Sequence, residues 1–164
     1  KLNQEQEGNL DFGDAPVQDR GFKVLKLDKS NFKEWQQLDP SASVEEIERE
    51  LFNHINHIDP KSTPEDLLYE ILLKAGFTLT EKIETVTIAD TKVFSIADGG
   101  LLLCLEKSVT KELIDAVAEA EPMHFICLDS AFHGNDQLKA NAVQTFAARN
   151  MQREKHNQIK FETV

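Results

Sequence analysis

Two short runs of apolar residues place the tightest limit on what this chain can fold into. They are residues 101–105 (LLLCL) and 123–128 (MHFICL). Short continuous apolar runs are typical of strands covered on both faces, as in a parallel sheet. The segment between them carries Leu113 and Val117 at helical spacing, and Ser108 can cap that helix. The spacing predicts a right-handed β–α–β unit.

The chain around this unit extends it into a larger α/β fold. Alternating residues on either side of Asp90-Thr91 predict a β-hairpin before the first apolar run. A helix from about Asn135 and a last strand over residues 159–163 follow the second run. We therefore predict a β-hairpin followed by βαβαβ, in a three-layer and mainly parallel sheet whose two apolar strands are central.

The first half of the chain is predicted to be mostly helical. Ser43 and Glu46 form a capping box for one amphipathic helix, and Thr63-Pro64 begins a second one that Gly76 ends. A short turn joins them, which predicts an antiparallel helical hairpin over residues 44–75. The remaining predictions for this half are an extended arm over residues 1–20, a strand over 21–28 and a short helix over 30–37. The predicted domains are residues 1–20 as arm or linker, 21–78 as strand plus helical hairpin, and 79–164 as a small α/β domain.

Composition and charge narrow the class of protein. The net charge is -11, which opposes primary binding to a phosphate backbone. No stretch has the roughly 18 to 20 apolar residues that a bilayer span needs, so no membrane partner is expected. Cys104 and Cys127 lie in the apolar runs, which indicates free thiols and a cytoplasmic setting. The chain begins at Lys1 with a polar run, which we interpret as an internal boundary of a longer protein.

The sequence offers few groups for catalysis, and we predict no catalytic, cofactor or metal residues. Asp129 follows a buried strand, where an acidic residue can hold a ribose, but no glycine-rich turn accompanies it. A role in fixing its loop is favoured. His54 and His57 could supply two metal ligands with Asp59 nearby, but no further Cys or His is spaced to complete the set. Burial argues against either cysteine as a nucleophile.

Binding surfaces are the more promising feature. The two amphipathic helices carry more apolar and aromatic surface than one small sheet is expected to cover, which predicts pairing with a second copy of the chain. The candidate interface consists of Leu51, Phe52, Ile55, Leu68, Tyr69 and Leu72. A locally basic stretch near the C-terminus supplies the candidate phosphate contacts Lys139, Arg149 and Arg153. Packing of these helices wholly within the domain, or against the rest of a longer protein, is left open beside self-pairing. The alternatives left open for function are a small-molecule-binding module and an auxiliary DNA-contacting module.

Three blocks of sequence resemble a region of one protein family. They are residues 19–35 (DRGFKVLKLDKSNFKEW), 65–74 (EDLLYEILLK) and 128–146 (LDSAFHGNDQLKANAVQTF). In this order and at similar spacing, they resemble segments downstream of the catalytic core in the modification subunits of type III restriction-modification systems. Together with residues 101–105 and 110–114, the resemblance covers nearly all of the chain from Asp19 onward.

The resemblance implies a non-catalytic assembly role. Those subunits are adenine-specific DNA methyltransferases that use S-adenosylmethionine, pair with a second copy and join a restriction subunit. Their catalytic Asp-Pro-Pro-Tyr type motif has no match, since Asp39-Pro40 and Asp59-Pro60 continue differently, and their Phe-x-Gly-x-Gly cofactor loop is absent. The resemblance therefore implies that this chain serves subunit pairing, and that catalysis, the cofactor and DNA binding belong to the rest of the parent enzyme.

Overall fold

The computed structural model describes residues 22, 24–34, 37–55 and 57–164, without the side chain of Ile55. The predicted arm over residues 1–20 lies outside the described residues. The helices are α1 (Val44–Ile55), α2 (Pro64–Lys74), α3 (Lys111–Ala120) and α4 (Asp136–Asn150), with 3-10 turns at Asp129–Phe132 and Lys155–Asn157. The strands are β1 (Ile83–Ile88), β2 (Thr91–Ile96), β3 (Leu101–Cys104), β4 (His124–Cys127) and β5 (Lys160–Thr163).

The five strands form one mixed sheet in the order β1-β2-β3-β4-β5. β1 pairs with β2 and β2 with β3 in antiparallel fashion, whereas β3, β4 and β5 are parallel. The α/β class is confirmed, and both apolar strands lie inside the sheet as predicted. The expectation of a mainly parallel sheet is corrected, because the hairpin joins the sheet through β3 and contributes two antiparallel pairings.

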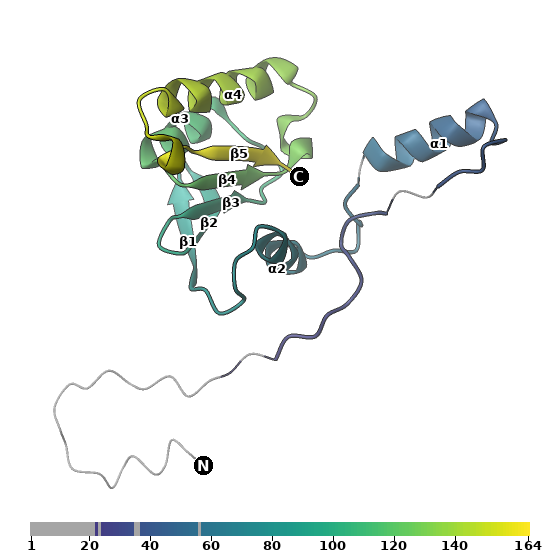
Figure 1. Ribbon diagram of the computed structural model, residues 1–164, viewed down its shortest axis with the longest axis horizontal. Coiled ribbons are helices and arrows are strands. Elements are labelled where there is room, and N and C mark those ends of the chain that lie inside the picture. Colours follow the sequence, from purple (N-terminus) through teal and green to yellow (C-terminus); the bar gives the residue numbers. More distant parts are fainter. Residues whose placement is uncertain (1–21, 23, 35–36, 56) are drawn as a thin grey trace, which may run out of the picture.

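Alternation of side chains along the strands builds a separate core on each face of the sheet. Figure 1 shows α3 and α4 on one face and α2 on the other. On β3, Leu101 and Leu103 belong to the core beside α2, while Leu102 and Cys104 belong to the core beside α3 and α4. The buried residues of α2 are Leu67, Leu68, Ile71 and Leu72. A division of the chain at residues 78 and 79 would thus separate α2 from strands with which it shares a core.

Local capping signals account for most helix boundaries. Thr63 and Asp66 form a complete capping box at the start of α2, and Asn135 caps α4. α3 begins later than predicted, because the Thr110 side chain rather than Ser108 accepts the hydrogen bond from the Leu113 amide. The hairpin turn also differs by one residue, and it consists of Ala89 and Asp90 with φ angles of 45° and 60°. Those left-handed values are what a two-residue turn requires.

Two predictions for the first half are wrong. Residues 24–30 have no regular structure and are exposed, so the predicted strand over 21–28 is not formed in its described part. The described residues of 30–37 are not helical either, and Phe32 instead forms an isolated antiparallel bridge with Ile58. An alternating pattern makes a strand only where a neighbouring strand supplies hydrogen bonds, and none of the five strands pairs with residues 24–30.

The two amphipathic helices also do not form the predicted hairpin. α2 lies across the sheet, while α1 projects away from both the sheet and α2 (Figure 1). The difference arises because the apolar stripe of α2 is matched by Ile96, Leu101 and Leu103 on the sheet. Packing against the sheet leaves α2 no apolar stripe for α1. No helix in the described part of the chain is long and apolar enough to span a membrane.

Candidate functional site

The structure separates the predicted interface residues into two groups. Leu68 and Leu72 are 5% and 0% exposed and pack within the core beside α2, so they cannot meet a second molecule without unfolding. Tyr69 is half-buried on the same helix. Leu51 and Phe52 are 52% and 69% exposed on α1. The prediction for the Ile55 side chain lies outside the described residues, and the candidate interface becomes α1 alone.

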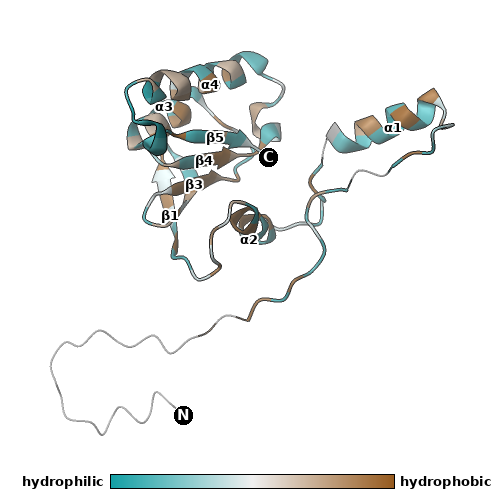
Figure 2. Cartoon of the chain, in the orientation of Figure 1, coloured by the Kyte–Doolittle hydropathy of each residue, from teal (hydrophilic) through white to brown (hydrophobic). Residues whose placement is uncertain are grey.

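The apolar side of α1 is an exposed surface, here called the α1 surface, and it includes two residues that the candidate interface left out. Its residues are Val44, Ile47, Leu51 and Phe52. Spacings of three and four residues place Val44, Ile47 and Leu51 on one stripe of the helix, and Phe52 follows Leu51 at the edge of that stripe. Figure 2 shows hydrophobic bands alternating with hydrophilic ones along this helix. An exposed apolar stripe on a projecting helix is typical of an interaction surface.

The loop that carries α1 is tied at its base beside the start of α2. The Lys33 amide donates to the His57 carbonyl at 2.6 Å, and the Asp59 amide donates to the Asn31 carbonyl at 2.8 Å. The rings of Phe32 and His57 stack with centroids 5.6 Å apart. These contacts hold the two ends of the loop together at its base.

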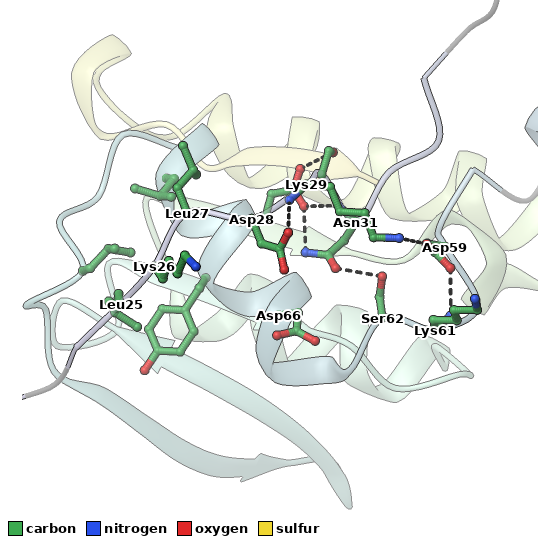
Figure 3. Close-up of a pocket in the computed structure, with 15 residues that line it drawn as sticks. Leu25, Lys26, Leu27, Asp28, Lys29, Asn31, Asp59, Lys61, Ser62 and Asp66 are labelled. Carbon is green, nitrogen blue, oxygen red and sulfur yellow. Dashed lines mark hydrogen bonds and ion pairs between the residues drawn. The ribbon is translucent and has the colours of Figure 1, made fainter.

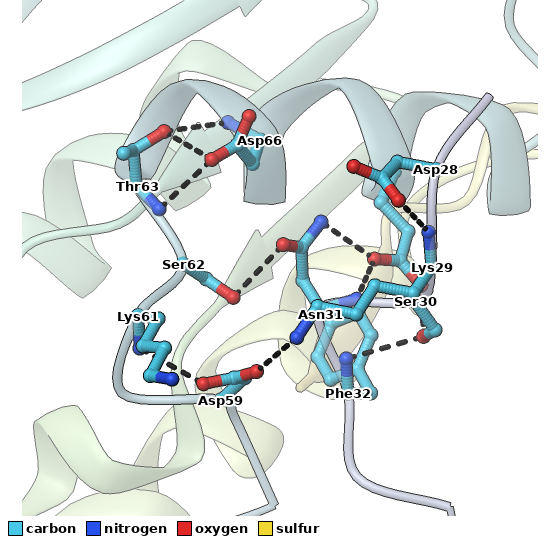
Figure 4. A network of polar contacts seen from close by, with 11 residues as sticks. Asp28, Lys29, Ser30, Asn31, Phe32, Asp59, Lys61, Ser62, Thr63 and Asp66 are labelled. Atoms are coloured by element: carbon cyan, nitrogen blue, oxygen red, sulfur yellow. Dashed lines mark hydrogen bonds and ion pairs between the residues drawn. The ribbon is translucent and has the colours of Figure 1, made fainter. Parts of the chain in front are cut away.

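A half-buried carboxylate holds the incoming chain to α2. Glu70 accepts hydrogen bonds from the Ser30 hydroxyl at 2.6 Å, from the backbone N–H of Asn31 at 2.6 Å and from the side-chain Nδ2 of Asn31 at 2.9 Å. Lys74 forms an ion pair with it at 2.9 Å. Asn31 in turn accepts a bond from the Ser62 hydroxyl at 2.8 Å, within the polar network of Figure 4. This Glu70 clip fastens residues 30–31 to the middle of α2.

The Glu70 clip changes the acidity of its own carboxyl group. Burial raises the pKa of Glu70, but the hydrogen bonds from Ser30, Lys74 and Asn31 outweigh burial and lower the pKa to about 2. Hydrogen bonds to the charged form of a carboxyl group stabilise that form. Glu70 is therefore a carboxylate at every physiological pH, and its chemistry is that of a fixed anchor rather than of a proton donor.

A pocket of about 690 Å³ lies beside this clip, between residues 25–31 and α2 (Figure 3). Its size is within the range of small-molecule sites. Several of its polar groups already bind one another: Asp59 pairs with Lys29 at 3.0 Å, and Asp66 accepts bonds from Thr63. Because these polar groups already have partners, we interpret the pocket as the space between α2 and residues 25–31. These residues cross α2 and are called the strap.

The three candidate phosphate contacts are each engaged by protein groups. Lys139 pairs with Asp129. Arg153 forms an ion pair with Glu121 at 2.5 Å, and Arg149 lies 3.6 Å from the same carboxylate. Binding a phosphate would mean exchanging these partners, so the local positive charge seen in the sequence is largely neutralised in the fold.

The groups considered for catalysis have structural surroundings. Asp129 binds Lys139 and so ties the end of β4 to α4, in keeping with a loop-fixing role. Cys104 and Cys127 are buried, and burial raises the pKa of the Cys127 thiol to about 12. His54 lies 3.1 Å from Glu50, whereas His57 stacks on Phe32. Among the described residues, no three His, Cys, Asp or Glu side chains are grouped to hold a metal ion.

No family model and no curated protein matches this chain.

Proposed function

We propose that this chain is a non-catalytic assembly module that pairs with a second copy of itself through the α1 surface. The observation that carries the proposal is the exposure of four large apolar side chains along one projecting helix. Leu68 and Leu72, which the candidate interface also contained, have no part in the proposed contact because they belong to the core.

On its own, α1 has little to stabilise it. It has 12 residues, and isolated helices shorter than about 12 to 15 residues are marginal in water. Most helical stability in proteins comes from packing an apolar face against another element. A second chain would supply that packing, and a stable interface buries roughly 1,200 to 2,000 Å² in total.

The resemblance supplies the setting of the proposal. The parent protein would be the modification subunit of a type III restriction-modification system, an adenine-specific DNA methyltransferase of the cytoplasm. S-adenosylmethionine, the catalytic motif and target recognition would belong to other parts of that enzyme, and the restriction subunit would be a further partner. The net charge of -11 and the engaged Arg149 and Arg153 support protein contact rather than DNA contact for this chain.

Phe52→Glu is expected to weaken pairing, because it places a charge in the α1 surface at a side chain that is 69% exposed. In light scattering over a concentration series, the wild-type chain should approach twice the mass of one chain, and the variant should need about a hundredfold higher concentration. Val143→Glu, at an exposed apolar residue of α4, is the matched control and should pair like the wild type. A wild-type chain that stays monomeric throughout would contradict self-pairing, and a dimer indifferent to Phe52→Glu would place the interface elsewhere.

A further inference from the structure

The face of the sheet beside α2 is only partly covered. α2 packs on the side nearer β2 and β3, and a groove of about 730 Å³ lies beyond it, over β4 and β5. Its apolar lining includes the exposed Met123 and the half-buried Phe77 and Val164, together with Ile71 of α2 and Ile126 of β4, which are buried. Met123 is 63% exposed although it stands directly before a buried strand. This region is called the β4–β5 groove.

We propose that the β4–β5 groove receives the α1 surface of a second copy of this chain, so that each copy gives its helix to the other. The inference rests on the proposed function, because it names where the paired helix binds. The α1 surface is apolar and exposed, and the groove combines exposed and half-buried apolar side chains with a charged rim. An amphipathic helix lying in a groove that is apolar along its base is a recurring mode of recognition. Methionine at such a groove adapts its shape to an incoming side chain.

Charge supports this pairing of surfaces. The rim of the groove carries Lys74 and Lys160 against Glu162, with His57 and His124 beside them. Glu162 is itself engaged, since it lies 2.7 Å from both His124 and Lys160. The first two turns of α1 carry four glutamates, at positions 45, 46, 48 and 50, against one arginine. Within one chain Lys74 pairs with Glu70 and Lys160 with Glu162, but the two lysine side chains are 59% and 63% exposed. Their exposed amino groups favour correct encounter with an acidic helix, and the glutamates of α1 disfavour pairing of two α1 helices with each other.

The base of the α1 loop explains why the occupant is a second copy rather than the helix of the same chain. His57 lines the groove and follows α1 by two residues. The Lys33 amide donates to the His57 carbonyl at this point of the chain, and α1 points away from the sheet (Figure 1). To dock in the groove of its own chain, α1 would have to turn back toward the sheet within two residues of His57. Reciprocal exchange keeps the direction that α1 has in Figure 1 and gives a closed twofold dimer with two identical contacts.

Mixing two defective variants tests the proposal. Leu51→Glu damages the helix, and Met123→Glu damages the groove at an exposed side chain, so each variant alone should dimerise about a hundredfold more weakly than the wild type in sedimentation equilibrium. When the two are mixed, a heterodimer holds one intact helix and one intact groove. Heterodimer should therefore form at concentrations where each variant alone is monomeric. Met151→Glu, at a methionine that is 86% exposed at the end of α4, is the control and should dimerise normally.

Each result has one meaning for the proposal. If Leu51→Glu disrupts the wild-type dimer and Met123→Glu leaves it intact, the groove is not the binding site, but self-pairing through α1 still holds. Loss of pairing in both variants without recovery on mixing would also overturn the reciprocal contact. A wild-type chain that is monomeric at every concentration would instead overturn the proposed function itself. If the wild-type chain is a monomer and Met123→Glu makes its α1 more sensitive to protease, then α1 docks in the groove of its own chain.

Discussion

Leu72→Ala is expected to lower the free energy of unfolding by about 2 to 5 kcal/mol, which is the usual cost of removing a fully buried leucine side chain. Leu72 is 0% exposed and lies in the core between α2 and the strands. Truncation leaves a cavity. The strands beside it, β2 and β3, cannot move to close it because each is hydrogen-bonded to a neighbour on both edges. Urea unfolding followed by circular dichroism measures the change.

Leu51→Ala is the matched control for this substitution. Leu51 is 52% exposed, so the same change should alter the stability of the monomer by no more than about 0.5 kcal/mol. The pair of variants separates the two helices that the sequence pattern treats alike. Equal losses at Leu72 and Leu51 would show that α1 packs in the core and would remove the basis for the α1 surface.

Acidification is expected to release residues 30–31 from α2, because the Glu70 clip requires a charged carboxylate. The folded pKa of about 2 lies below the ordinary value of 4.5. A carboxyl group with a lowered folded pKa stabilises the fold fully above its unfolded pKa and loses that contribution as the pH falls. The loss therefore begins near pH 4.5 and continues as the pH falls through 2, and it amounts to something on the order of 3 kcal/mol for this side chain, which is 15% exposed.

Two measurements check the Glu70 clip. Titration of the Glu70 carboxyl carbon by nuclear magnetic resonance should give a midpoint near 2, and the Asn31 amide signal should follow the same curve because that amide donates to Glu70. At neutral pH, Glu70→Gln should speed hydrogen exchange at the Asn31 amide by at least about tenfold. Glu119→Gln, at an exposed position of α3, should leave that exchange unchanged. A midpoint near the ordinary 4.5 would mean that the clip does not hold the strap.

The second half of the fold could be predicted from local sequence because its signals are strong and agree. The apolar runs became β3 and β4, and the Asn135 cap began α4 close to where it was expected. Periodicity could not predict how the hairpin joins the sheet. Alternation indicates that two strands pair with each other, but it does not indicate which other strand they pair with. Its pairing through β3 made the sheet mixed.

The first half was harder because its outcome depends on contacts between distant segments. The patterns of α1 and α2 are alike, yet only α2 meets a complementary face, formed by Ile96, Leu101 and Leu103. The Glu70 clip joins residues about 40 positions apart in sequence, and a single glutamate in a helix gives no sign of such a partner. For the same reason, the sequence showed the positive charge of Arg149 and Arg153 but not the Glu121 carboxylate that pairs with them.

Hydrogen exchange along α1 tests most directly the claim that this helix is a pairing surface. An unpaired helix of 12 residues should exchange its amides almost as fast as an unstructured peptide, whereas a helix packed against another chain should be protected. Exchange over Val44–Ile55 should therefore slow as the concentration of the wild-type chain rises, and it should stay fast in Phe52→Glu at every concentration. Exchange over α1 that does not change with concentration in the wild-type chain would contradict the account.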